Sequence, residues 1–135
     1  MKALVVDDEL TTRMVLQEIL SGYGEVHSCV DGSEAVLAHR RALERGHPYD
    51  LICMDILMPN MGGLEALQII RREEESHGRV QPRRTKAIIT TAADDDQTIG
   101  RAFQGLCDAY ILKPIDAEEL LGLVHCLFPI GEGVA

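Results

Sequence analysis

The chain has 135 residues, 46% of them hydrophobic, and its formal net charge at pH 7 is −9. This length and this hydrophobic content suit one folded domain and argue against disorder. The negative charge argues against direct nucleic-acid binding, and no apolar run approaches the roughly 20 residues that a membrane span needs.

The cysteines and the N-terminus indicate where the chain works. The N-terminus lacks the pattern of a secretory signal peptide. The four cysteines form no CxxC pair and have no metal-ligand spacing. Cys29 and Cys53 fall within apolar segments, so we expect buried thiols there. A reduced, cytoplasmic setting follows.

Apolar segments alternate with amphipathic ones along the chain. In chain order, the expected elements are a strand at about Lys2–Val6, a helix at Thr11–Leu20, a strand at Val26–Val30, a helix capped near Asp31 and ending near Arg45, a strand ending at Asp55, a helix from about Gly63, a strand at Lys86–Thr90, a helix after Asp94-Asp95-Asp96, a strand at Ala109–Leu112 and a helix from Asp116. This alternation predicts an α/β fold, a doubly wound parallel sheet covered on both faces.

The helices are predicted from their spacing and their ends. In the first, Val15/Ile19 and Leu16/Leu20 lie four residues apart, and Gly22 follows the helix end. In the fourth, Ile99, Ala102, Phe103 and Leu106 give the spacing of a buried face.

The third helix fades into a run of charges, Arg71-Arg72-Glu73-Glu74-Glu75, and then into a polar stretch from Ser76 to Arg84. We interpret these charges, including Arg83-Arg84, as a solvated face and an exposed loop rather than a binding patch. The five histidines have no metal spacing, and we interpret each as a surface or hydrogen-bonded residue.

Four of the predicted strands deliver polar groups at the same end. Asp7-Asp8 follow the first strand, Asp55 ends the third, Thr91 follows the fourth and Lys113 follows the fifth. Open α/β sheets place their chemistry at the carboxyl ends of the strands. The sequence therefore predicts a phosphate and metal site built from distant parts of the chain.

The residue types indicate what this site does. Three neighbouring carboxylates repel one another, and Mg²⁺, which takes few carboxylates and fills its other positions with water and phosphate oxygens, suits them. Asp7 and Asp8 are adjacent and cannot point the same way, so one ligates directly while the other holds a coordinated water. Asp55 is the natural nucleophile toward phosphorus, because carboxylates form acyl phosphates. Lys113 can neutralise developing charge, and the Thr91 hydroxyl can donate to a phosphoryl oxygen.

Each motif alone has a structural explanation. An Asp-Asp-Glu run is often a polar loop with a helix cap, Pro59 and Gly62-Gly63 are simple chain breakers, and Lys113-Pro114 alone is a weak signal. Their joint occurrence at the ends of successive strands is what favours a site.

From Lys2 to Phe128 the chain resembles the receiver domain of two-component response regulators, especially the single-domain chemotaxis regulators. An acid pair follows the first strand, and Asp55 through Gly63 match the D-x-x-M-P-x-M-x-G motif that the phosphoacceptor aspartate heads. Thr91-Ala92 and Lys113-Pro114 match the family's Thr-Ala and Lys-Pro pairs, and Tyr110 lies where the family has an aromatic switch residue. The segment from Glu73 to Arg84 looks longer than is usual.

The resemblance implies a five-stranded sheet of order 2-1-3-4-5 with five flanking helices, spanning residues 1–128, before a short tail, 129–135. It implies that Asp55 accepts a phosphoryl group from a sensor histidine kinase or phosphotransfer protein. Mg²⁺ would be held by Asp7, Asp8, Asp55 and the main-chain carbonyl of Leu57, and the Lys113-Pro114 peptide bond would be cis. Thr91 and Tyr110 would switch the face of the fourth helix, fifth strand and fifth helix toward a downstream protein.

Two other functions compete with this interpretation. A magnesium-dependent phosphohydrolase would need a second acid two residues after Asp55, where Leu57 stands. A phosphorylation-independent interaction module would be suspected if the acceptor or the lysine were missing, and neither is. We therefore expect a phosphoacceptor with weak autophosphorylation and autodephosphorylation, not an enzyme. We also expect no transcriptional output from this chain, since no output domain follows the last helix.

Overall fold

The computed structural model describes residues 1–92 and 100–129. In chain order the elements are β1 (Lys2–Val6), α1 (Leu10–Ser21), β2 (Glu25–Cys29), α2 (Gly32–Glu44), β3 (Leu51–Asp55), α3 (Gly63–Ser76), β4 (Lys86–Thr91), β5 (Ala109–Leu112) and α5 (Ala117–Leu127). The predicted boundaries of these elements agree with the observed ones to within about one residue.

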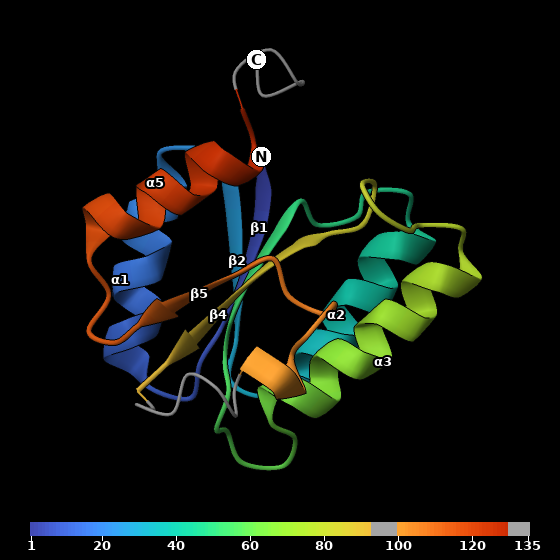
Figure 1. The fold of residues 1–135 in the computed structure, drawn as a ribbon, viewed down its shortest axis with the longest axis horizontal. Coiled ribbons are helices and arrows are strands. Elements are labelled where there is room, and N and C mark those ends of the chain that lie inside the picture. The colour runs from blue at the N-terminus through green and yellow to red at the C-terminus, as the bar shows by residue number, and fades with distance from the viewer. Residues whose placement is uncertain (93–99, 130–135) are drawn as a thin grey trace.

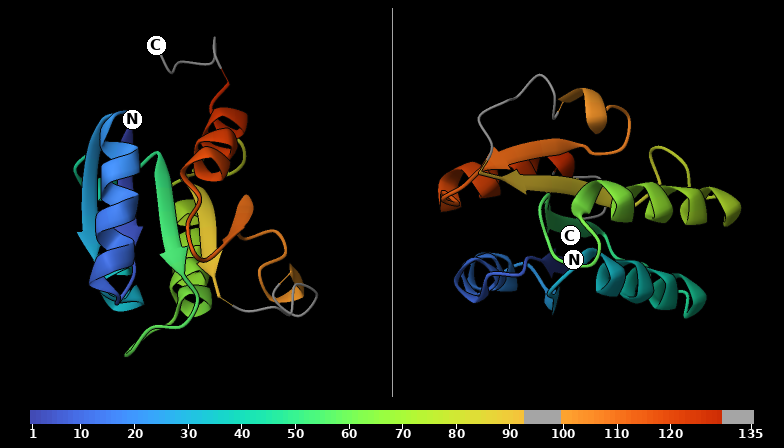
Figure 2. Two further views of the ribbon diagram at one scale, coloured as in Figure 1. Left: turned by 90° about the vertical axis from the view of Figure 1, so that its left-hand side faces the viewer. Right: turned by 90° about the horizontal axis from the view of Figure 1, so that it is seen from below.

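The five strands form one parallel sheet in the order β2-β1-β3-β4-β5, which confirms the predicted fold. Helices α1 and α5 cover one face of the sheet, and α2 and α3 cover the other (Figure 1). The view from below in Figure 2 separates the two layers of helices most clearly. The strands therefore all end on the same edge, as the prediction of the site requires.

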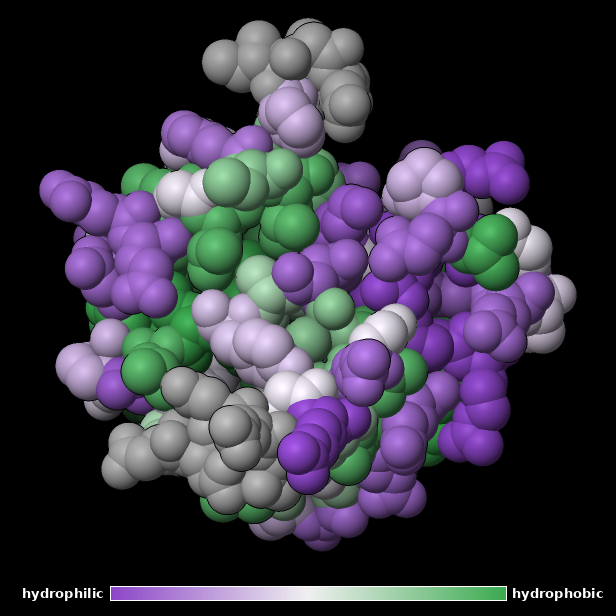
Figure 3. Space-filling model, viewed as in Figure 1, coloured by the Kyte–Doolittle hydropathy of each residue, from purple (hydrophilic) through white to green (hydrophobic). Residues whose placement is uncertain are grey.

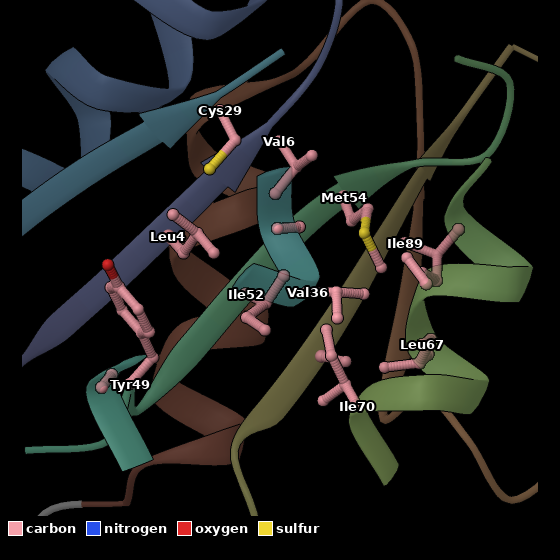
Figure 4. Close-up of a cluster of buried hydrophobic side chains, with 14 of the residues drawn as sticks. Leu4, Val6, Cys29, Val36, Tyr49, Ile52, Met54, Leu67, Ile70 and Ile89 are labelled. Carbon is pink, nitrogen blue, oxygen red and sulfur yellow. The ribbon is translucent and has the colours of Figure 1, made fainter. Parts of the chain in front are cut away.

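Side chains of the central strands alternate between two apolar clusters. One cluster, drawn in Figure 4, joins the sheet to α2 and α3 and includes Leu4, Val6, Ile52 and Met54. The other joins it to α1 and α5 and includes Ala3, Val5, Leu51 and Cys53. Because helices cover both faces, every residue of β3 is buried, and this explains its unbroken apolar run.

The two thiols expected in the core are there. Cys29 and Cys53 are buried and unpaired. Burial, which disfavours the thiolate, is the main cause that raises the pKa of each to about 12. Neither thiol is therefore a reactive group at neutral pH.

Strand β2 and helix α1 differ in detail from their predictions. Only Cys29 of the five β2 residues is buried, because β2 is an edge strand with a single neighbour. In α1, Leu16 and Leu20 are buried as predicted, whereas Val15 is 38% exposed. The core-facing stripe of α1 is thus narrower than the spacing suggested.

The run of charges at the end of α3 is only partly the solvated face that we expected from the sequence, since Arg72 and Glu75 are exposed but Arg71 and Glu74 are not. Arg71 and Glu74 are both buried, and the guanidinium contacts the carboxylate at 2.7 Å. Arg71 also donates to the carbonyl oxygens of Thr85 (2.7 Å) and Leu106 (2.8 Å). Glu74 in turn contacts His39 Nε2 at 3.3 Å and accepts from the Thr85 N–H at 2.8 Å.

This buried group, which we call the Arg71 cluster (His39, Arg71, Glu74, Thr85, Asp108), ties α2 and α3 to the starts of β4 and β5. Asp108 lies 3.5 Å from Arg71 Nη2 and accepts from the Ala87 N–H at 2.8 Å. Burial alone would raise the pKa of Glu74, but the hydrogen bond with His39 and the charge of Arg71 lower it to about 2. A signal was present in the sequence, since Arg71 and Glu74 lie four residues after Leu67 and Ile70 on the buried face.

The fourth predicted helix lies partly outside the described residues, as do Asp94-Asp95-Asp96, Ile99 and most of the predicted tail. Residues 100–102 are helical. Phe103 is buried as expected, while Ala102 is exposed. Within 1–92 and 100–129, no helix combines the length and the apolar character that a membrane crossing requires.

Candidate functional site

The predicted site residues meet at the carboxyl edge of the sheet because the parallel strands are in register. Val6 pairs with Met54, so Asp7 and Asp55 each come one residue further on. Asp55 pairs with Thr90 on β4, and Thr91 pairs with Leu112 on β5. Lys113 follows directly, and its N–H donates to the carbonyl oxygen of Thr91 at 2.8 Å. We call Asp7, Asp8, Asp55 and Lys113 the carboxylate site.

Asp7 is fully buried at the end of β1. Its Oδ1 accepts from the Glu9 N–H at 2.8 Å, and its Oδ2 lies 2.8 Å from the Lys113 ammonium. The guanidinium of Arg13 donates to the Asp7 carbonyl oxygen at 2.8 Å and fixes the turn from β1 into α1. Asp8, the next residue, is exposed.

Asp55 is 8% exposed at the end of β3. Its Oδ1 accepts from the Ile56 N–H at 2.8 Å, and its Oδ2 lies 3.1 Å from Lys113 Nζ. Burial is the main cause that raises the pKa of Asp55 above its ordinary value, and the hydrogen bond and charge of Lys113 oppose it. One oxygen of the Asp55 carboxylate therefore accepts a hydrogen bond from the backbone, and the other contacts a cation.

Lys113 is a cationic partner of Asp7 that is not evident near it in the sequence, because it lies over a hundred residues away along the chain. Its peptide bond to Pro114 is cis, as the resemblance implied. Burial would lower the pKa of Lys113, but its hydrogen bonds with Asp7 and Asp55 raise it above the ordinary value. The same ammonium contacts Glu9 Oε1 at 3.2 Å, a contact that sequence reasoning missed.

Oxygen atoms of Asp7, Asp8 and Asp55 all lie within 4.8 Å of one another. Asp7, Glu9 and Asp55 contact the single ammonium of Lys113, and Asp8 adds a further carboxylate beside them, so negative charge prevails at the mouth of the site. Such a set of hard oxygen donors can hold a divalent cation.

The other predicted residues surround this centre. Thr91 is buried at the end of β4, and Leu57, in the loop after β3, is 81% exposed. Tyr110 is 39% exposed, and its ring packs edge-on against Phe103 with 6.5 Å between the centroids.

The loop that follows Asp55 is held by groups that sequence reasoning did not single out. Asn60, with φ of 67°, donates through its side chain to Asp31 Oδ2 at 2.9 Å. The Gly32 N–H donates to the Met61 carbonyl oxygen at 2.9 Å. A Cβ on Gly63 would collide with the Asp55 carbonyl oxygen, so glycine is required where α3 starts against β3. These contacts anchor the loop to the start of α2.

Comparison with known proteins agrees with this geometry. A family model described as the response regulator receiver domain matches residues 3–125. A probable histidine kinase 2 of Oryza sativa subsp. indica is 33% identical over 135 residues, covering 93% of this chain. The chain spans 12% of that relative's own length.

Two solved structures share the fold. The receiver domain of the histidine kinase CKI1 from Arabidopsis thaliana, complexed with Mg²⁺ and BeF3⁻, is 32% identical and superposes with a TM-score of 0.77, covering 93% of this chain and 88% of that one. A CheX-CheY-BeF3-Mg²⁺ complex from Borrelia burgdorferi is 25% identical with a TM-score of 0.79, covering 94% and 88%.

Proposed function

Since the chain belongs to the response regulator receiver family and is a receiver domain of phosphorelay signalling, we propose that Asp55 accepts a phosphoryl group from a histidine kinase or phosphotransfer protein. Phosphorylation then changes the affinity of the chain for a downstream protein.

The observation that carries this proposal is the contact of one ammonium with two carboxylates at the carboxyl edge of the sheet. Lys113 lies 2.8 Å from Asp7 and 3.1 Å from Asp55. Of the two acids, Asp7 is fully buried, whereas Asp55 retains some exposure. Asp55 is therefore the acid that an incoming phosphoryl group can reach.

Mg²⁺ fits the site. Lys113 supplies one positive charge against Asp7, Asp8, Asp55 and the nearby Glu9, so a divalent ion would relieve the remaining repulsion. Asp7, Asp8, Asp55 and the main-chain carbonyl of Leu57 would hold it. When bound, Mg²⁺ would neutralise charge that develops on the phosphoryl oxygens. Both solved neighbours named above contain Mg²⁺.

In the transfer step, an oxygen of Asp55 attacks phosphorus. The new O–P bond forms as the bond from phosphorus to the donor's imidazole nitrogen breaks, and that nitrogen keeps the electron pair. The product is an acyl phosphate. Lys113, already in contact with Asp55, neutralises part of the added charge, and the Thr91 hydroxyl donates to a phosphoryl oxygen.

The response to phosphorylation lies on the neighbouring face. Thr91 moves toward the phosphoryl group, and Tyr110 turns inward from its exposed position. The face of the fourth helix, β5 and α5 then binds its partner differently. Figure 3 shows apolar surface over α5 and β5, where Leu112 is 49% and Tyr110 39% exposed.

Acetyl phosphate and a phosphate-affinity gel test the proposal. The wild-type chain should give a single shifted band that requires Mg²⁺, and Asp55→Asn should abolish it. Asp50→Asn is the matched control, because Asp50 is an exposed acid just before the start of β3, at the far end of the same strand. A shifted band that persists in Asp55→Asn, or that forms fully in excess chelator, would contradict the proposal.

We infer a signalling domain rather than a phosphohydrolase. The position two residues after Asp55, where a hydrolase would carry its second acid, is the exposed Leu57. The four cysteines are free, and Cys29 and Cys53 are buried, which agrees with a reducing compartment, so we propose that the chain acts in the cytoplasm.

A further inference from the structure

The edge of the sheet opposite the carboxylate site holds a cavity of about 810 Å³. Its lining includes Met1, Asp50 and Lys86, which immediately precede β1 and β3 or begin β4. We call this surface the amino-terminal pole; in Figure 1 the N-terminus and the start of β1 lie toward the top of the view. Since these strands are five or six residues long, the pole is about 15–20 Å from the carboxylate site.

The lining of the pole is basic although the chain as a whole is acidic. Arg79, Arg83, Arg84 and Lys86 all line the cavity, together with a single acid, Asp50. That acid already accepts from the Lys2 N–H at 2.8 Å. The net charge of the whole chain is −9. Four cations within eight residues therefore make a local positive field that the composition hides.

Most of these cations have no anionic partner in the part of the chain that the structure describes. Arg84 is held by Asp108 at 3.7 Å and donates to the Gly105 carbonyl oxygen at 2.9 Å. Arg79, Arg83 and Lys86 form no ion pair among the described residues. The Nε of Arg79 is also buried without an acceptor among them, which is unfavourable for a guanidinium nitrogen.

The remaining lining is apolar. Pro48, Pro82, Leu127 and Phe128 form part of the wall. A volume of this size lies within the range of small-molecule sites, which combine apolar walls with a few placed polar groups. Inorganic phosphate alone would leave most of such a cavity unfilled.

We propose that the amino-terminal pole binds a small phosphorylated molecule with an apolar or ring-bearing body, the chemical class to which nucleotides belong. The guanidinium groups of Arg79 and Arg83 take phosphate oxygens through paired N–H donors, and Lys86 adds a point charge. The proline, leucine and phenylalanine side chains cover the body of the ligand. This site is separate from the carboxylate site and does not depend on phosphorylation of Asp55.

Binding of three probes to the full chain tests the proposal in buffer without divalent metal, which leaves the carboxylate site unable to hold phosphate through Mg²⁺. The probes are ATP, tripolyphosphate and adenosine. Their binding is measured by changes in the amide chemical shifts of the chain in NMR spectra. ATP should bind most tightly and shift Arg79–Lys86 and Leu127–Phe128 rather than residues around Asp55. Tripolyphosphate should bind at least threefold more weakly, and adenosine should not bind measurably.

Two variants and a control localise the effect. Arg79→Gln/Arg83→Gln and, separately, Arg83→Gln/Lys86→Gln should each weaken ATP binding at least tenfold while keeping the dispersed spectrum of a folded chain. Arg41→Gln/Arg45→Gln removes two exposed arginines of α2 and its C-cap and should change nothing.

Equal loss in the control, or shifts confined to the carboxylate site, would overturn the proposal. If tripolyphosphate bound as tightly as ATP, the ring of the ligand would contribute nothing to binding, and the proposed role of the apolar wall would be wrong. If a short polyglutamate peptide bound as tightly as ATP and displaced it, the pole would be a docking site for acidic peptides instead.

Discussion

The ammonium of Lys113 occupies the side of the carboxylate site that a metal ion would also favour. It lies within 3.2 Å of Asp7, Glu9 and Asp55 at once. We predict that Lys113→Ala tightens Mg²⁺ binding about threefold to tenfold, because it removes a competing cation from the same carboxylates, a change on the order of 1 kcal/mol. Titration calorimetry measures this, and Lys86→Ala is the control at the other end of the sheet. Weaker binding in Lys113→Ala would mean that the lysine organises the acids rather than competing for them.

We predict that the ionised carboxylate of Asp55 lowers the free energy of unfolding of the chain. Burial raises its pKa in the folded state, so its contribution to stability is present below its unfolded pKa and is lost as pH rises through the folded value. Asp55→Asn should therefore raise the free energy of unfolding at pH 7 without metal, on the order of 1 kcal/mol. Thermal melts between pH 3 and pH 8 test the sign, with Asp50→Asn as the control. A destabilised variant would indicate that the pair with Lys113 outweighs burial.

The lifetime of the acyl phosphate depends on side chains able to orient a water in line with phosphorus. The two best placed in sequence are Leu57 and Ala93, and neither can hydrogen-bond. Leu57 is 81% exposed at the mouth, while Ala93 lies outside the described residues. We predict slow self-dephosphorylation, with Leu57→Asn/Ala93→Glu decaying about tenfold faster, on the order of 1.4 kcal/mol of barrier. Decay of the phosphorylated band over time measures it, and equal rates would remove the argument.

At the scale of elements, α3 is held to the sheet through charge as well as through apolar packing. The Arg71 guanidinium contacts Glu74, Asp108 and two carbonyl oxygens. Removing one member of such a buried set leaves the other charge uncompensated. Replacing Arg71 and Glu74 together with apolar residues of similar size leaves no such uncompensated charge. We therefore interpret the cluster as fixing how α3 docks on the sheet rather than as a large source of stability.

We predict that Arg71→Met costs about 3–5 kcal/mol of unfolding free energy, and that Arg71→Met/Glu74→Leu recovers much of this loss. The lowered pKa of Glu74, about 2, means that its contribution is present above its ordinary pKa and is lost as pH falls toward 2. Urea unfolding between pH 2 and pH 6 measures both effects, with Glu74→Gln removing that pH dependence. Arg40→Met, which breaks an exposed pair with Glu73, is the control and should cost under about 1 kcal/mol. Equal losses in Arg71→Met and Arg40→Met would contradict the role of the cluster.

At the scale of the molecule, elements that have a periodic hydrophobic pattern could be predicted from the sequence. Individual contacts between residues far apart in the chain could not. The strands and helices were predicted from their hydrophobic patterns. The gathering of the site residues was predicted because parallel strands bring their carboxyl ends to one edge of the sheet. The pairing of Lys113 with Asp7 was not, since it depends on the fold alone. Arg71 and Glu74 were misinterpreted because charges in a row resemble a solvated face, although their spacing from Leu67 and Ile70 placed them inside.

Reasoning about strand ends points to only one residue of the amino-terminal pole. Lys86 starts β4 shortly after the pair Arg83-Arg84, as Asp55 ends β3. The segment between α3 and β4 lacks any periodicity, however, and its arginines cannot be assigned to a common surface without coordinates. The molecule is therefore electrically polarised along its strands, with acids at one end and cations at the other.

The burial of Arg71 also makes this side chain a natural spectroscopic reporter. Its guanidinium protons point at fixed acceptors and are shielded from water, so they should exchange slowly and give resolved nitrogen-bound proton signals, unlike those of the exposed arginines. We expect exchange of these protons with deuterium to need opening of the Arg71 cluster, because its hydrogen bonds and burial keep water away. Their exchange rate should therefore report how often α3 and the starts of β4 and β5 separate at this cluster, without any label near Asp55.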